Sequence, residues 1–262
     1  MGGECELSTE CLRKRIDRGE TVFGTFMKLP SSQVVEIFGL AGLDFVILDT
    51  EHGPLSFESI ETLILAAEVA GINPLVRVYD NDSALIGRAL DLGAQGVLVP
   101  HISTAEAAAR LAEASRFYPE GSRGICRYVR AARFSSTDRG DFFKRANAET
   151  LTVAMIEGTE GVANLDAILE VPGIDLVFVG PYDLSQALGV PGEVDNPLVL
   201  EAMSQIAKTA QVHKVALGTF ADDPKTAVRW AEAGVQLIAV STDVGLIYEK
   251  AKQTVHDLRG AV

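Results

Sequence analysis

The chain has 262 residues, 47% of them hydrophobic, and a formal net charge of −13. This length is close to that of one (β/α)8 barrel and too short for two ordinary enzyme domains with a linker. So acidic a chain should repel nucleic acid and anionic lipid, and it has no apolar run long enough for a membrane span, so we expect neither partner. Three irregularly spaced cysteines are typical of a reducing compartment and predict a cytoplasmic protein; they are Cys5, Cys11 and Cys126.

Eight short runs rich in β-branched and apolar residues predict β-strands. Most are continuously apolar rather than alternating, which is typical of parallel strands covered on both faces. The predicted strands are Thr21–Met27, Asp44–Leu48, Asn73–Val78, Gly96–Pro100, Leu151–Ile156, Asp175–Val179, Val215–Thr219 and Gln236–Val240.

Segments with helical periodicity lie between and after these runs, and several end at glycine. The predicted helices are Ser31–Ala41, Phe57–Ala70, Asp82–Leu92, Thr104–Ser115, Gly161–Leu169, Pro197–His213, Pro224–Ala233 and Val244–Leu258. Strict alternation of strand and helix, repeated eight times, predicts one parallel sheet closed into a barrel. A doubly wound open sheet is the rival fold, but the chain has no glycine-rich phosphate motif.

Two segments fall outside this repeat. Glu6–Arg18 predicts an extra amphipathic helix that caps the amino end of the barrel. Tyr118–Ala146 predicts a long, basic, irregular insert, which we interpret as a subunit contact. We therefore predict an α/β protein in which residues 1–262 form a single TIM-barrel domain with an extra N-terminal helix.

Polar residues follow several strands at the end where barrels carry their sites. Asp49 and His52 follow the second strand, Arg77 ends the third, Glu157 follows the fifth and Asp183 follows the sixth. Because neighbouring strands are about 4.8 Å apart, carboxylates after strands five and six can share one cation. Two carboxylates without a paired His or Cys favour a hard divalent ion, Mg²⁺, Mn²⁺ or Co²⁺, that also binds a 2-oxo acid substrate.

This set of residues predicts carbon–carbon bond cleavage through an enolate. Arg77 adds a positive charge near the substrate oxygen, and His52 moves protons. The lysines lie mostly on helices and loops, which does not favour a Schiff-base aldolase.

Simpler interpretations remain open for each residue. Asp183, with Gln186 three residues later, resembles a helix N-cap box, and Glu157 can simply favour the start of the next helix. His52 can be an ordinary loop histidine, Arg77 a surface charge, and Asp49 a hydrogen-bond acceptor for its own loop. His101 is interpreted as pocket lining.

Several motifs, in order, resemble those of the HpcH/HpaI aldolase family over roughly residues 20 to 250. They are Leu48–His52, Arg77, Leu90–Pro100, Tyr118–Gly124, Arg145–Asn147, Asn164–Ile168 and Gly180–Leu184. The family consists of metal-dependent (class II) pyruvate aldolases on a phosphoenolpyruvate-mutase-like barrel. The resemblance implies cleavage of a 4-hydroxy-2-oxo acid, such as a 2-dehydro-3-deoxy-glucarate-like or 4-hydroxy-2-oxo-heptanedioate-like substrate, to pyruvate and an aldehyde.

The resemblance also implies roles for individual residues. His52 falls on the catalytic base, Arg77 on the residue that stabilises the enolate, and Glu157 and Asp183 on the metal ligands. Asp91 falls on an acidic residue that supports the histidine across a subunit interface. Relatives are commonly hexamers, trimers of dimers, that exchange the last helix between neighbours, so a homo-oligomer is implied.

The sequence departs from the family pattern beside the expected substrate site, which comprises Met155, Gly180, Pro181, Tyr182 and Asp183. Met155 stands where a glutamine is usual, Tyr182 replaces a small residue, and His101 replaces an apolar one. These departures predict a narrower or differently polar pocket. Two other functions stay open: decarboxylation of an oxaloacetate-type acid, and a non-catalytic barrel that binds a carboxylate metabolite.

Overall fold

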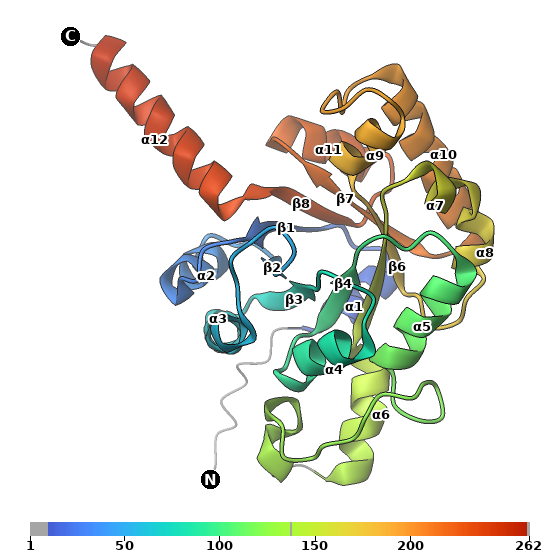
Figure 1. The fold of residues 1–262 in the computed structure, drawn as a ribbon. Helices are drawn as coiled ribbons and strands as arrows, with labels where there is room; N and C mark the ends of the chain where they lie inside the picture. The colour runs from blue at the N-terminus through green and yellow to red at the C-terminus, as the bar shows by residue number, and fades with distance from the viewer. Residues whose placement is uncertain (1–9, 137, 261–262) are drawn as a thin grey trace.

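The computed structural model describes residues 10–136 and 138–260, which form a closed barrel of eight parallel strands in chain order (Figure 1). Each strand pairs with the next one along the chain, and β1 pairs with β8. The predicted (β/α)8 fold is confirmed. The strands are β1 (Val22–Met27), β2 (Phe45–Asp49), β3 (Asn73–Arg77), β4 (Gly96–Val99), β5 (Leu151–Ile156), β6 (Leu176–Val179), β7 (Ala216–Ala221) and β8 (Leu237–Thr242).

Helices surround the barrel, and side-chain caps fix where several of them begin. Asp82, Thr104 and Asp223 each accept hydrogen bonds from backbone N–H groups in the first turn that follows, which satisfies donors that a helix leaves free. The helices are α1 (Leu12–Asp17), α2 (Ser32–Leu40), α3 (Phe57–Ala70), α4 (Ser83–Asp91), α5 (Ala105–Ser115), α6 (Arg139–Glu149), α7 (Thr159–Ala163), α8 (Leu165–Leu169), α9 (Pro181–Ala187), α10 (Pro197–His213), α11 (Pro224–Glu232) and α12 (Asp243–Gly260), with a 3-10 turn, η1 (Arg130–Ser135).

Alternate strand residues divide the core into two layers. Phe45 and Ile47 of β2 lie in the barrel interior, whereas Val46 and Leu48 pack against the surrounding helices. Strand residues are buried on both faces, which explains why the strands are continuously apolar in sequence.

Helix α1 closes the amino end of the barrel, as predicted. Its buried Leu12 and Ile16 belong to the interior core, and Gln236 donates a side-chain hydrogen bond to the Ile16 carbonyl. The predicted helix began at Glu6, and its residues 6–9 lie outside the described residues.

Two local predictions are wrong. The helix expected over Gly161–Leu169 is divided into α7 and α8 at Asn164, whose side chain donates a hydrogen bond to the Ser103 carbonyl. The insert expected to be irregular contains α6, which is held by an aromatic cluster of Phe117, Phe142 and Phe143. The two aromatic residues within α6, Phe142 and Phe143, are adjacent in sequence, so they do not produce the repeat of three or four residues that indicates a helix.

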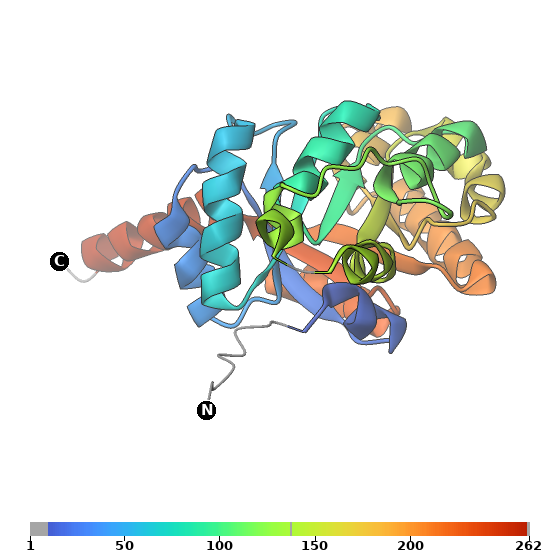
Figure 2. The same ribbon diagram turned by 90° about the horizontal axis from the view of Figure 1, so that it is seen from below.

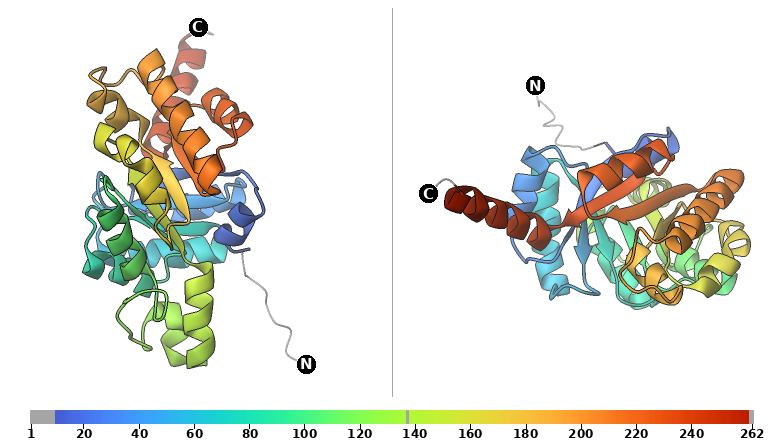
Figure 3. Two further views of the ribbon diagram at one scale, coloured as in Figure 1. Left: turned by 90° about the vertical axis from the view of Figure 1, so that its right-hand side faces the viewer. Right: turned by 90° about the horizontal axis from the view of Figure 1, so that it is seen from above.

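The last helix, α12, projects away from the barrel (Figure 1), and the views in Figure 2 and Figure 3 show the same extended arm. Only Asp243, its first residue, is buried. Asp243 accepts hydrogen bonds from the backbone N–H groups of Lys28 and Leu29, which ties the base of α12 to the end of β1. Among the described residues, no helix has the length and apolarity needed to cross a membrane.

Candidate active site

A buried ion pair joins the carboxyl ends of β2 and β3. Asp49 and Arg77 are direct partners in the strand register, so their side chains emerge side by side. Arg77 donates through Nε to Asp49 Oδ1 at 2.9 Å and through Nη2 to Oδ2 at 2.7 Å. This fork-to-carboxylate geometry is the strongest form of such a contact. Burial alone would raise the pKa of Asp49, but the bonds from Arg77 outweigh burial and hold it below its ordinary value.

Asp49 also shapes the loop that follows it. Its Oδ1 accepts hydrogen bonds from the backbone N–H groups of Glu51 and His52, and Lys28 Nζ lies 3.7 Å from its Oδ2. The interpretation that Asp49 serves its own loop is therefore correct. It holds the Arg77 guanidinium at the same time, so the two interpretations of this residue are compatible.

The Arg77 guanidinium has two further neighbours at the mouth of the barrel. It lies 4.8 Å from the centre of the Phe26 ring, and its Nη1 is 2.9 Å from Glu51 Oε2, an ion pair whose geometry does not make a hydrogen bond. Only 8% of the Arg77 side chain is exposed. The alternative of a surface charge is thereby excluded, and Arg77 is a fixed cation at the barrel mouth.

Glu157 follows β5 and is a buried carboxylate with excess negative charge around it. Burial has the largest effect on the pKa of Glu157 and raises it. The hydrogen bond from the His101 backbone and the charge of its ring lower the pKa, and the nearby carboxylates Glu51 and Asp183 raise it further. Its Oε2 accepts a hydrogen bond from the His101 backbone N–H at 3.0 Å. A Cβ atom at Gly180 would lie 3.1 Å from the Glu157 carboxylate, so this close approach depends on glycine.

Asp183 lies in the first turn of α9, with its side chain exposed. The N-cap position is occupied by Gly180 and the first helical position by Pro181, so the interpretation of Asp183 as the N-cap is wrong. The β5–β6 register aligns Ile156 with Val179, which brings the segment after β6 alongside Glu157.

The donor set fits a hard divalent ion. Within the part of the chain that the structure describes, no group of three or more His, Cys, Asp or Glu residues could hold a metal. Two carboxylates, one of them buried without a full countercharge, match a cation that keeps several water or substrate oxygens. Mg²⁺, Mn²⁺ and Co²⁺ remain the expected ions.

The predicted base His52 lies in the loop after β2, with 58% of its side chain exposed. Its Nε2 is 3.8 Å from Glu51 Oε2. Asp91 ends α4 at the opposite end of the barrel, where its Oδ1 accepts a hydrogen bond from Arg123 Nη2. Within one chain Asp91 is therefore remote from His52, and its expected role from a neighbouring subunit stays a prediction.

His101 and Glu51 lie beside the site and contact its charged residues, which the sequence alone did not predict. His101 follows β4 with a φ of 59°, in the left-handed region. Its Nδ1 is 3.2 Å from Glu157 and its Nε2 is 3.4 Å from Glu51, so it bridges two carboxylates. Glu51 was not singled out, although its position two residues after Asp49 is a signal that both side chains can face the same side.

The substrate-side residues differ in environment. Met155 is buried and belongs to the barrel interior, and Pro181 is also buried. Tyr182 is 45% exposed, and its hydroxyl donates a 2.7 Å hydrogen bond to Asp222 Oδ1. Burial of its hydroxyl and the Asp222 carboxylate raise the pKa of Tyr182 to about 12. Tyr182 therefore forms a neutral, polar edge beside Asp183.

Comparison with known proteins identifies the family. The model of the HpcH/HpaI aldolase/citrate lyase family matches residues 22–249. The chain belongs to this family. The HpcH/HpaI resemblance of its motifs is thereby confirmed, and the family membership accounts for the barrel and for the order of polar residues after its strands.

Relatives within the HpcH/HpaI family include enzymes that act on keto acids. The hydroxypyruvate/pyruvate aldolase of Roseobacter denitrificans is 36% identical over 92% of this chain and 93% of its own. The 2-keto-3-deoxy-L-rhamnonate aldolase of Klebsiella pneumoniae is 35% identical, covering 89% of this chain and 87% of the relative. A family member from Burkholderia cenocepacia has a crystal structure with a TM-score of 0.90 and 34% identity, covering 95% of this chain and 98% of its own.

Proposed function

We propose that this protein is a divalent-metal-dependent aldolase that cleaves a 4-hydroxy-2-oxo acid to pyruvate and an aldehyde. The observation that carries the proposal is the buried Glu157 carboxylate, with Asp183 beside it and the fixed Arg77 cation at the same barrel mouth. The relatives, which are aldolases of keto acids, support the same reaction class.

The carboxylates and the arginine have different roles in the proposed reaction. Glu157 and Asp183 would hold the divalent ion, which when bound supplies the charge that polarises a keto group and stabilises an enolate. Arg77, oriented by Asp49 before substrate arrives, places a second positive charge at the mouth without reorganisation during the reaction.

His52 is the proposed proton carrier. Its ring is exposed enough to exchange protons with solvent, and it stands on the loop that Asp49 fixes through backbone hydrogen bonds. We propose that Asp91 of a neighbouring subunit supports this histidine in the assembled protein.

Exchange of the pyruvate methyl protons tests the proposal. Protein incubated with pyruvate in heavy water and Mg²⁺, Mn²⁺ or Co²⁺ should incorporate deuterium, measured by mass spectrometry of quenched pyruvate. Chelation and Glu157→Ala should each stop incorporation. Glu160→Ala is the matched control, because Glu160 is an exposed carboxylate three residues away.

The alternatives give different results in this experiment. Exchange that persists after exhaustive chelation or in Glu157→Ala contradicts the metal-dependent reaction. A protein that shows no exchange with any of the three ions fits the non-catalytic, carboxylate-binding barrel. Turnover of oxaloacetate that exceeds cleavage of hydroxy-oxo acids by orders of magnitude identifies a decarboxylase.

We further propose that the protein assembles as a homo-oligomer through α12. The arm exposes Ile247, Tyr248 and Leu258, and the neighbouring helices α2 and α3 expose Leu40 and Val69. Apolar side chains exposed on a helix that projects from the barrel can pack against another chain. Light scattering should give a mass of several chains, trimers of dimers if the relatives' arrangement holds, and removal of α12 should lower it. A monomeric full-length protein contradicts this assembly.

A further inference from the structure

A hydrogen bond between Tyr182 and Asp222 joins the segments after β6 and β7 at the edge of the site. The Tyr182 hydroxyl donates to Asp222 Oδ1 at 2.7 Å, and the Tyr182 ring makes an edge contact with Phe220 at 6.0 Å between centres. Tyr182 directly precedes Asp183, the proposed metal ligand. The pair therefore borders the proposed ion site on the side of β7.

Aromatic contacts continue from this pair to the fixed cation. The ring centres of Phe220 and Phe26 are 6.1 Å apart, and the Arg77 Cζ atom is 4.8 Å from the centre of the Phe26 ring. We call Phe26, Phe220, Tyr182 and Asp222 the selector wall. The Phe26 end of the wall lies against the paired Arg77 guanidinium, and the other end carries the Asp222 carboxylate, so the negative charge of the wall is at its β7 end.

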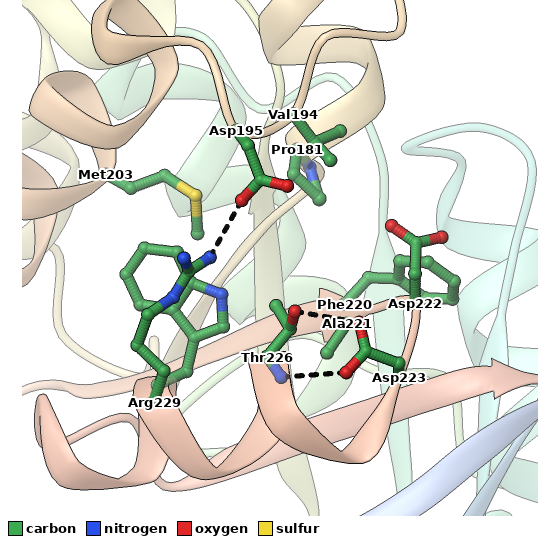
Figure 4. Close-up of a pocket in the computed structure, with 11 residues that line it drawn as sticks. Pro181, Val194, Asp195, Met203, Phe220, Ala221, Asp222, Asp223, Thr226 and Arg229 are labelled. Carbon is green, nitrogen blue, oxygen red and sulfur yellow. Dashed lines mark hydrogen bonds and ion pairs between the residues drawn. The ribbon is translucent and has the colours of Figure 1, made fainter.

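A small cavity of about 130 Å³ lies behind the wall, between the end of β7 and the start of α10 and α11 (Figure 4). It is lined by Asp195, Asp222, Asp223 and Arg229, among others. Arg229 pairs with Asp195 at 3.1 Å, and Asp223 accepts the hydrogen bonds that cap α11. Figure 4 shows Asp222 turned away from both of these pairs, so its charge is balanced by neither.

From this arrangement, and resting on the proposed aldolase function, we infer that the selector wall makes the enzyme prefer aldehydes with a neutral, hydroxylated far end over aldehydes that end in a carboxylate. A hydroxyl group can donate to the Asp222 carboxylate, whereas a second carboxylate is repelled by it. Both substrates suggested by the sequence are diacids that release an aldehyde with its own carboxylate, so the inference favours instead a 4-hydroxy-2-oxo acid that releases a neutral, hydroxylated aldehyde.

The aldol direction gives the sharpest test. A proton leaves the pyruvate methyl group, the methyl carbon bonds to the aldehyde carbon, and the aldehyde oxygen takes up a proton to give a 4-hydroxy-2-oxo acid. Glyceraldehyde and tartronate semialdehyde are matched acceptors, because both have three carbons and differ only in a terminal alcohol or carboxylate. The measured quantity is the ratio of kcat/KM for the acidic acceptor to that for the neutral one.

The wild-type ratio should lie well below one, and Asp222→Asn should raise it about tenfold, because it removes the negative charge that the inference sets against a terminal carboxylate. Asp222→Ala removes the same charge and should act in the same direction, which keeps the test valid if one variant folds poorly. Asp17→Asn is the matched control: Asp17 is exposed on α1 at the other end of the barrel, and its loss should leave the ratio unchanged.

Two outcomes overturn the inference: a wild-type preference for tartronate semialdehyde, or a ratio that neither Asp222 variant changes. Wild-type exchange of the pyruvate methyl protons separates these results from failure of the proposed function. If exchange is present and the ratio does not respond, only the inference fails. If wild-type protein shows no exchange, the aldolase function fails and the inference with it.

Discussion

Two groups of charges face each other across the barrel mouth, and they differ in how they are balanced. At the ends of β2 and β3, Asp49 and Arg77 neutralise each other through two short hydrogen bonds. After β5 and β6, Glu157 and Asp183 are two carboxylates, and the neighbours of Glu157 include a third, Glu51. The first group is paired within the chain, whereas the second is not, and this imbalance is the basis for proposing that it binds a cation.

The pKa values show the same difference. Both Asp49 and Glu157 are buried, and burial raises the pKa of a carboxyl group. Hydrogen bonds from Arg77 reverse that effect for Asp49, but contacts with His101 do not reverse it for Glu157. The β2–β3 group thus holds the Arg77 guanidinium in a fixed, paired position, whereas the carboxylates of the β5–β6 group are left without a full countercharge, which supports the proposed ion site.

The largest effect should come from replacing the fixed cation. Arg77→Lys keeps the charge but loses the fork geometry, so it should lower the rate of pyruvate proton exchange roughly 10²- to 10³-fold, the cost of one such stabilising group. Arg18→Lys is the control, because Arg18 forms exposed ion pairs. A rate for Arg77→Lys within the range of this control would show that Arg77 has no part in the reaction.

The balanced group should also stabilise the fold. Asp49→Asn removes the carboxylate that holds the buried Arg77 through two hydrogen bonds, and we expect the free energy of unfolding at pH 7 to fall by about 3 kcal/mol in urea denaturation. Asp195→Asn disrupts an exposed pair and should cost less than about 1 kcal/mol.

The difference between wild type and Asp49→Asn should depend on pH in one direction. Because the folded pKa of Asp49 is below its ordinary value of 3.8, its stabilising contribution is present above that pH and is lost as pH falls through the folded pKa. The gap should therefore be full at pH 7 and narrow below about pH 4. A gap that widens in acid would contradict the proposed balance.

The unbalanced group should respond with the opposite sign. In the presence of chelator, Glu157→Gln removes a buried, uncompensated charge and keeps an acceptor for the His101 N–H, so it should raise the free energy of unfolding by on the order of 1 kcal/mol. With excess Mg²⁺ this advantage should disappear, because only the wild type is stabilised by the ion. Destabilisation in chelator would mean that Glu157 is already balanced.

The smallest effect concerns the edge of the site. Tyr182 should ionise near pH 12, and the difference in alkaline absorbance titration between wild type and Tyr182→Phe isolates it from the other tyrosines. Asp222→Asn should lower this pKa, since Asp222 is one of its causes. Ionisation near pH 10, the ordinary value, would show that the contact with Asp222 is absent in solution.

The sequence was sufficient to predict the barrel and the strand ends at which the site lies. Continuous apolar runs identify parallel strands, and the residue after each run is then at the carboxyl end, which located Asp49, Arg77 and Glu157 correctly. Contacts between loops could not be predicted. The contacts of His101 with Glu51 and Glu157 depend on a left-handed backbone conformation at residue 101. The Tyr182–Asp222 hydrogen bond joins two segments that follow different strands, and no periodic pattern in the sequence indicates that they meet.

The break between α7 and α8 could not be predicted from the sequence either. Asn164 divides α7 from α8 because its side chain bonds to a loop 61 residues away in the chain, and such a long-range contact overrides local helical periodicity.

Direct binding of Mn²⁺ tests the central claim that the β5–β6 carboxylates hold a divalent ion. Chelator-treated protein is titrated with Mn²⁺, and free ion is followed by electron paramagnetic resonance for the wild type, Glu157→Gln and the exposed-site control Glu160→Gln. We predict one ion per chain in the wild type and in the control, and loss of that site in Glu157→Gln. Binding of equal affinity in Glu157→Gln, or no binding by the wild type, would contradict the account.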